Sequence, residues 1–325
     1  MTEQTDHSGN LVRGLDRIPL WTSGWRKLIT FLAISGSKGK GPFTQEEFLA
    51  RWSSIQKAAA RTKDLRDMTK GFWEMESLGA AYGEVPPPGC TLRDPDLPIE
   101  VRPIVHTGMG VASVEVGNFD PVEISRRIES LAHPDFRLFA YESVGAMLGA
   151  YEVPLPKRLV GLKPLPRPQP EEFIPCFSPE IQRLISVGYG RILYFNSGSI
   201  SAAMHRIAAR PFLDAPAAVL GVAFACAMIN HRDFWLVLET EGKFRNPSWN
   251  RAYRDGLIYA LEFWEWEVPG FLRSLQPAGP RSADLIAVAQ REIESCIGRG
   301  CLNAFFVEHA VMNSSSGYFK LCSLV

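Results

Sequence analysis

The stretch FWEMESLGAAYG at residues 72–83 is echoed by LFAYESVGAMLG at residues 138–149, and the two align without a gap. The identities begin with Glu76, which matches Glu142, and end with Gly83, which matches Gly149. In both stretches apolar and small residues recur three, four or seven positions apart, the spacing of an α-helix with one apolar face. The chain is therefore predicted to use the same kind of helix at least twice.

Two further echoes extend this pattern. The tripeptide Glu-Val-Pro follows both stretches, at 84–86 and 152–154, and returns at 267–269 after another apolar segment. In addition, ISRRIESLAHPDF at 124–136 resembles ISAAMHRIAARPF at 200–212, and each leads through proline into an apolar segment. One helical hairpin cannot cover its own apolar helix, so several copies must stack. We expect a mostly α fold of repeated, pseudo-symmetric helical hairpins.

The domain organisation is inferred from shifts in composition. Residues 1–24 are polar and are expected to form a loose N-terminal arm. Residues 25–325 are expected to form one helical, repeat-like domain, with halves 25–153 and 176–325 joined by the Pro-rich connector 154–175. Within the first half, helices are predicted at 25–34, behind a capping box formed by Thr44 and Glu47, and over 64–83.

One segment is predicted to be β. Residues 99–116, IEVRPIVHTGMGVASVEV, are rich in β-branched side chains and favour a strand pair. Gly108 and Gly110 fall in its middle and are interpreted as the hairpin turn. A dinucleotide-binding loop has similar glycine spacing, but it requires a helix where these residues favour a strand.

Composition excludes several classes of protein. Of 325 residues 46% are apolar, and 35 basic residues balance 35 acidic ones. These proportions are typical of a soluble globular protein with a large core, and the absence of net charge gives no global field for a nucleic acid or an anionic membrane. We expect neither as a partner.

Cysteines, histidines and the N-terminus indicate a cytoplasmic protein without a metal or other cofactor. The six cysteines show no Cys-x-x-Cys pair, and the six histidines show no ligand spacing. The N-terminus lacks the apolar centre of a signal peptide. The longest apolar run, 215–229, is shorter than the ~20 residues that span a bilayer, so we expect a buried core helix and no membrane span.

Glu76 and Glu142 are the main candidates for chemistry, because each lies on the apolar stripe of its helix. A buried carboxylate is either paired or lines a cavity. Burial would raise its pKa toward neutrality, which suits a general acid or base, and the small-residue face would admit a ligand. Asp255, within RAYRDGLIYALEFWEWEV, is a third candidate catalytic carboxylate.

The competing interpretation is structural, with Arg191 in GYGRILYF as the ion-pair partner of Glu142. In the catalytic interpretation Arg191 would instead help to bind substrate. The aromatic residues expected to line such a ligand are Phe139, Tyr141, Tyr259 and Trp264. An aromatic stripe at helical spacing also fits an ordinary core, so this alternative stays open.

Four segments in order carry a family resemblance: FAYESVGAML (139–148), GYGRILYF (188–195), AAVLGVAFACA (217–227) and RAYRDGLIYALEFW (251–264). Over roughly residues 120–270 the chain resembles an uncharacterised bacterial family encoded in gene clusters for enediynes and related natural products. Glu142, Gly188, Gly190, Arg191 and Gly221 fall on positions that match it. The family's Asp-Gly-Tyr-Gly-Phe-His segment has no clear counterpart here. The resemblance implies natural-product biosynthesis and defines no reaction.

The sequence therefore leads to one expected function and two alternatives. We expect a protein that binds a bulky apolar biosynthetic intermediate between its helices and carries out cofactor-free isomerisation or cyclisation, with Glu142 as the acid or base. The first alternative is a non-catalytic accessory protein that stabilises a partner enzyme of the same pathway. The second is a protein that sequesters the finished product without changing it.

Overall fold

The computed structural model describes residues 65–86, 102–152, 165–166, 168–230, 244–267, 271–277 and 279–298, together with positions 46, 50, 53, 54, 237, 238 and 242. Throughout these residues the regular structure is helical, and no strand occurs. The long helices are α3 (Leu65–Glu84), α4 (Arg102–Gly117), α6 (Arg137–Glu152), α8 (Pro179–Phe195), α10 (Ala215–Ile229), α12 (Pro247–Glu267) and α14 (Pro280–Gly298). Shorter helices are α5 (Pro121–Leu131), α7 (Pro170–Phe173), α9 (Ile200–Ala208) and α13 (Phe271–Ser274).

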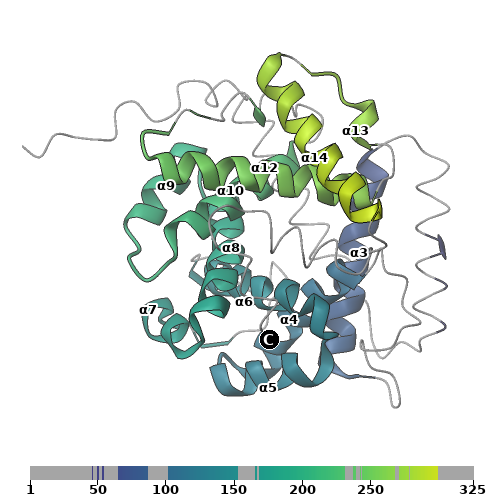
Figure 1. Ribbon diagram of the computed structural model, residues 1–325. Coiled ribbons are helices and arrows are strands. Elements are labelled where there is room, and N and C mark those ends of the chain that lie inside the picture. The colour runs from purple at the N-terminus through teal and green to yellow at the C-terminus, as the bar shows by residue number, and fades with distance from the viewer. Residues whose placement is uncertain are drawn as a thin grey trace, which may run out of the picture.

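The long helices form a row in which each packs on the next: α3, α4, α6, α8, α10, α12 and then α14. Figure 1 shows this row as an arc from α3 at the right, through α4 and α6 below, to α10 and α12 above, with α5, α7 and α9 on its outer side. The fold is thus a curved layer of long helices with short connecting helices outside it.

Neighbouring helices from α3 to α12 run parallel, because residue numbers rise together on both sides of their contacts. Gly79 of α3 faces Val105 of α4, and four residues later Gly83 faces Met109. Between α8 and α10, Ser186 accepts a hydrogen bond from the backbone of Asp214, and Gly190 faces Ala218. Parallel neighbours need a connection that returns to the starting end. The connections that contain α5 and α9 make that return on the outside of the arc.

Glycines bring the backbones of adjacent helices into contact at equivalent places. A Cβ on Gly108 would lie 1.8 Å from the carbonyl oxygen of Glu76, and one on Gly188 would lie 1.6 Å from that of Glu142. Both distances are far inside van der Waals contact, so only glycine fits. The matched residues Glu76 and Glu142 therefore occupy matched positions at two crossings, α3 with α4 and α6 with α8.

The ends of the helices follow the sequence signals. Helices α3, α6 and α12 end at Glu84, Glu152 and Glu267, the first residue of each Glu-Val-Pro tripeptide. This is expected because the residue before proline is disfavoured in the α conformation. At the other end, Ser178 and Asp214 cap α8 and α10, each followed by proline in the first turn.

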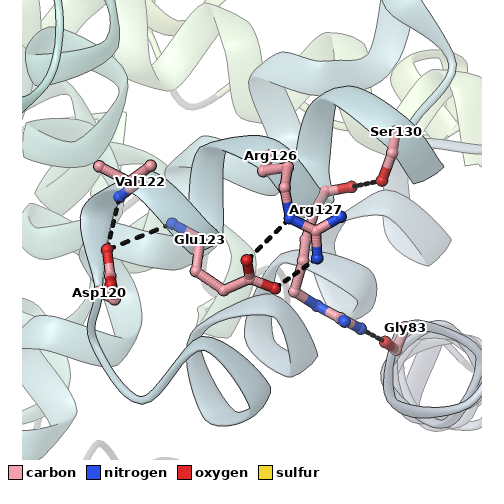
Figure 2. A network of polar contacts seen from close by, with 7 residues as sticks. All are labelled: Gly83, Asp120, Val122, Glu123, Arg126, Arg127 and Ser130. Carbon is pink, nitrogen blue, oxygen red and sulfur yellow. Dashed lines mark hydrogen bonds and ion pairs between the residues drawn. The ribbon is translucent and has the colours of Figure 1, made fainter.

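The outer helix α5 is tied to the row by polar contacts (Figure 2). Asp120 caps its start by accepting hydrogen bonds from the backbone of Val122 and Glu123. From its far side Arg127 donates to the carbonyl of Gly83 in α3. The matched carbonyl of Gly149 in α6 accepts a hydrogen bond of 3.3 Å from the side chain of Asn196, just after α8. Side chains therefore satisfy both carbonyls near helix ends.

The predicted β hairpin at 99–116 is wrong: residues 102–117 form α4. Val105, Met109 and Ala112 lie at helical spacing and are buried, and the helix as a whole is buried on several sides. A helix that is buried on several sides has apolar residues all around it, so the 3.6-residue spacing of an apolar face is not visible in its sequence. The β-branched residues therefore led to the prediction of a strand pair. Gly108 and Gly110 are helix-crossing points against α3 and α6 and form no turn.

Several predicted elements lie outside the described residues. These are the arm 1–24, the helix 25–34, most of the helix behind Thr44 and most of the connector 154–175, although α7 begins within that connector. Among the helices that the structure describes, none combines the length and the apolar content needed to cross a bilayer. The predicted core helix 215–229 is confirmed as α10, almost all of it buried.

Candidate functional site

A buried ion pair joins the two central helices of the row. Nη2 of Arg191, in α8, lies 2.5 Å from Oε2 of Glu142, in α6. The side chain of Glu142 is 4% exposed and that of Arg191 is 16% exposed. Burial raises the pKa of Glu142, and Arg191 opposes this rise by favouring the ionised form.

Aromatic side chains from the next two helices enclose this pair. The guanidinium carbon of Arg191 lies 4.3 Å from the centre of the Phe224 ring in α10, a cation–π distance. The ring of Tyr259 in α12 lies 4.7 Å from that of Phe224, centre to centre. Burial, followed by the charge of Glu142, raises the pKa of Tyr259 well above its usual value. Glu262, one turn further along α12 and also buried, raises it as well.

Glu76 reaches the same region from the first helix of the row. It is only partly accessible to solvent, and burial raises its pKa to about 7. The charge of Arg191 lowers that pKa. Glu76 therefore lies within electrostatic range of the Glu142–Arg191 pair, and at neutral pH both of its protonation states are populated.

Three buried polar atoms in this cluster make no hydrogen bond of regular geometry among the described residues, although each belongs to a side chain that interacts within the cluster. They are Oε2 of Glu142, Nε of Arg191 and the hydroxyl of Tyr259. The short contact from Arg191 to Glu142 is an ion pair that is not aligned as a hydrogen bond. An unsatisfied buried polar group destabilises a folded protein by about 1–3 kcal/mol. Oε2 of Glu142 is paired with Arg191, and the Tyr259 hydroxyl also interacts with the Arg191 side chain, so a polar group of a ligand would share these partners.

The cluster thus offers an acceptor and donors at one point. In its ionised form, which Arg191 favours, the carboxylate of Glu142 can take a proton, while Arg191 Nε–H and the Tyr259 hydroxyl can each donate to an oxygen atom. Glu76, with a pKa near neutrality, can supply a proton. Together these are the groups needed to move a proton next to a carbonyl.

Three other residues predicted to bind substrate, Tyr141, Phe139 and Trp264, make their own contacts in the structure. Tyr141 donates a hydrogen bond of 3.2 Å to Glu129 of α5, on the outer side of the row. Phe139 is 1% exposed and stacks on Phe136. Trp264 is 0% exposed and stacks on Phe271 of α13. In the structure these three side chains pack on neighbouring residues, and Phe139 lies one turn before Glu142 on α6.

Asp255, the third predicted catalytic residue, lines a different feature. It lies one turn before Tyr259 on the same face of α12. It borders a groove of about 290 Å³ between the N-terminal parts of α8, α10 and α12. Glu142 and Arg191 do not line this groove.

Two members of the cluster were not predicted. Phe224 lies in a helix that is apolar on every side, so nothing in the sequence distinguishes it from its neighbours. Glu262 lies in LEFWEWEV, seven residues after Asp255, and therefore on the same face of α12. Its place among apolar residues is the same signal that identified Glu142, and it could have been found in the same way.

In the part of the chain that the structure describes, no three His, Cys, Asp or Glu side chains are grouped as metal ligands would be. Comparison with known proteins finds no family model, no curated protein and no solved structure that matches this chain. Any functional conclusion therefore rests on the geometry of the site and on the residues themselves.

Proposed function

We propose that this protein moves protons on a bulky apolar carbonyl compound, as a cofactor-free isomerase or cyclase of bacterial natural-product biosynthesis. The observation that carries the proposal is the set of buried polar groups of Glu142, Arg191 and Tyr259, which come from three different helices and meet around one ion pair. The assignment to natural-product biosynthesis rests on the sequence resemblance over residues 120–270.

In the proposed reaction Glu142 takes a proton from the carbon next to the carbonyl. The electron pair of the broken C–H bond moves into the carbonyl group, so that negative charge develops on oxygen. Arg191 Nε–H and the Tyr259 hydroxyl donate to this oxygen, which is the most effective form of electrostatic stabilisation in such reactions. Where the substrate carries a carbon–carbon double bond β,γ to the carbonyl, Glu76 then delivers a proton to the γ carbon. The double bond moves into conjugation with the carbonyl, and the product is an isomer of the substrate.

Two properties of the cluster support these roles. Arg191 lies 2.5 Å from Glu142 and favours the ionised carboxylate that a base requires. Glu76 has a pKa of about 7, close to the value at which a general acid works best in neutral solution. Phe224 and Tyr259 supply apolar surface beside these groups.

The test is exchange of carbon-bound hydrogen for deuterium, followed by NMR, in a panel of bulky cyclic ketones that begins with 2-decalone. We expect the protein to accelerate exchange next to the carbonyl, and Glu142→Gln to lower the rate by about 100-fold or more. Glu123→Gln is the matched control, since Glu123 forms an exposed pair with Arg126 on α5 (Figure 2) and its loss is expected to leave the rate unchanged.

The accessory-protein alternative has its own supporting observation, the near-complete burial of the Glu142–Arg191 pair. Under that alternative Glu142→Gln lowers the free energy of unfolding, and no ketone exchanges faster with protein than without it. Exchange that is accelerated but equally fast in Glu142→Gln would exclude Glu142 as the base.

We also propose that the row of helices was built by repetition. Matched glutamates at matched crossings, and the matched hydrogen bonds to Gly83 and Gly149, support this interpretation.

A further inference from the structure

The groove beside Asp255 joins an apolar surface to the first turns of α10 and α12. Ala217, Leu220 and Ala252 supply the apolar surface and are buried. The groove has a volume of about 290 Å³, at the lower end of the range for small-molecule sites, which begins at about 300 Å³. It therefore suits a compact ligand with a short aliphatic part.

The acidic side chains that line the groove already interact within the protein. Asp214 pairs with Arg183 at 3.3 Å and accepts a hydrogen bond from the backbone N–H of Ala217, so that it caps α10. Asp255 has an interaction of its own within the structure. A cationic ligand would compete with these contacts, so the acidic residues do not favour one.

Arg251 is the charged residue of the groove that remains open to a ligand. Its side chain is exposed and forms no ion pair or hydrogen bond with any residue that the structure describes. Arg183, by contrast, is held by Asp214. In the described part of the chain, the groove therefore offers an available positive charge next to an apolar surface.

The start of α12 adds to this positive charge. Ser248, in the first turn of the helix, lines the groove, and that turn contains no acidic residue. The N-terminus of a helix carries a partial positive charge, and helical side chains lean toward it. Arg251 lies one turn further along and is therefore close to a charge of its own sign. An anion bound between the two would be stabilised by both.

The ligand is expected to carry a single negative charge. Asp214 and Asp255 line the same groove and would repel a more highly charged anion. A guanidinium group binds one carboxylate through two parallel N–H···O bonds, which fixes the orientation of the ligand. A carboxylate joined to a short aliphatic chain therefore matches both the charge of Arg251 and the apolar surface.

We propose that this groove is a binding site for a short-chain aliphatic monocarboxylate, with its carboxylate on Arg251 and its chain on Ala217, Leu220 and Ala252. The site is distinct from the Glu142 cluster and does not depend on the reaction proposed for it.

Ligand-observed NMR titration with 4-methylpentanoate, at constant ionic strength, tests this proposal. We expect saturable binding with a Kd of about 5 mM or tighter. The comparison ligands are 4-methylpentanamide, which has the same chain without the charge, and acetate, which has the charge without the chain. Each is expected to bind at least about tenfold more weakly, because it loses either the charged contact or the apolar contacts.

One variant and a control locate the binding. Arg251→Gln is expected to weaken binding of 4-methylpentanoate at least about tenfold, and Arg251 is exposed, so its replacement leaves the fold intact. Arg273→Gln, at an exposed arginine of α13 outside the groove, is the matched control and is expected to bind like the wild type. The proposal is overturned if 4-methylpentanoate shows no saturable binding up to about 50 mM. It is also overturned if the amide or acetate binds as tightly as 4-methylpentanoate, or if Arg251→Gln binds it normally.

Discussion

At the scale of single residues, two buried titratable groups oppose one another in their effect on stability. Burial raises the pKa of Glu76 from 4.5 to about 7 and lowers that of His106 from 6.5 to about 3. Between the two pKa values of Glu76, the folded protein keeps this side chain protonated while the unfolded chain is ionised. Between the two pKa values of His106, the folded protein keeps the imidazole neutral while the unfolded chain binds a proton. Between pH 4.5 and 6.5, a rise in pH lowers the contribution of Glu76 to the unfolding free energy and raises the contribution of His106.

The first prediction concerns Glu76→Gln. Because the folded-state pKa of Glu76 is raised, its contribution favours the folded state below pH 4.5 and is lost as pH rises toward 7. The slope is about 1.4 kcal/mol per pH unit. We expect the variant to gain stability over the wild type across this range, by about 3 kcal/mol in total. Urea unfolding at a series of pH values measures this difference, and a difference that does not change with pH contradicts it.

The second prediction concerns His106→Gln. The imidazole Nδ1–H donates to the carbonyl of Arg102 at 2.6 Å, and Nε2 accepts from the backbone N–H of His133 at 2.9 Å, so the ring is neutral. Its folded-state pKa is lowered, so the wild type loses stability as pH falls from 6.5 toward 3, by about 1.4 kcal/mol per unit. The difference in unfolding free energy between variant and wild type is expected to shift in favour of the variant as pH falls. The same urea series shows whether it does, and a shift toward the wild type would count against a neutral His106.

At the scale of helices, the glycine crossings predict which substitutions the fold tolerates. A Cβ on Gly188 would lie 1.6 Å from the carbonyl oxygen of Glu142, and neither backbone can move without separating α6 from α8. We expect Gly188→Ala to lower the unfolding free energy by about 3 kcal/mol or more. Gly198, in the turn before α9, has nothing within 4 Å of such a Cβ, so Gly198→Ala is the matched control. Chemical denaturation measures both, and equal effects would contradict the close crossing.

At the scale of helices, part of the fold could be predicted from the sequence. Helical spacing and the Glu-Val-Pro tripeptides predicted α3, α6 and α12, because local rules govern where a helix ends. The segment at 102–117 was predicted wrongly, because its valines follow β preferences until packing on both sides turns it into a helix. The parallel direction of the row could not be predicted, since it depends on connections that no local pattern describes.

The candidate site could also be predicted only in part. Burial of Glu142 and its pairing with Arg191 were foreseen as one of two interpretations, because a carboxylate on an apolar stripe requires a partner. Glu76 and Tyr259 were candidates from the sequence, but their grouping with Phe224 in one cluster was not predictable in detail. It depends on the curvature of the row, which brings the first helix within electrostatic range of the fourth.

At the scale of the whole molecule, stability is expected to vary along the row. Helix α8 packs on α6 and on α10, whereas the last helix, α14, packs mainly on α12. In a row of this kind each element depends on its neighbours, so a terminal element opens at lower free energy. We expect the amides of α8 to exchange with deuterium far more slowly than those of α14, as measured by mass spectrometry of peptides. Equal protection of the two helices would contradict a linear row.

The arrangement of the whole molecule also supports the central claim, that successive helices bring Glu142, Arg191 and Tyr259 together to act on a ligand. The most direct test is Tyr259→Phe, measured for both stability and ketone exchange. The hydroxyl is buried and its interaction with Arg191 is not a hydrogen bond of regular geometry, so its removal is expected to lower the unfolding free energy by at most about 1 kcal/mol. Deuterium exchange into 2-decalone, or into the panel ketone that exchanges fastest, is expected to slow by about 100-fold, because one donor to the developing oxyanion is lost. An exchange rate equal to that of the wild type would contradict the claim.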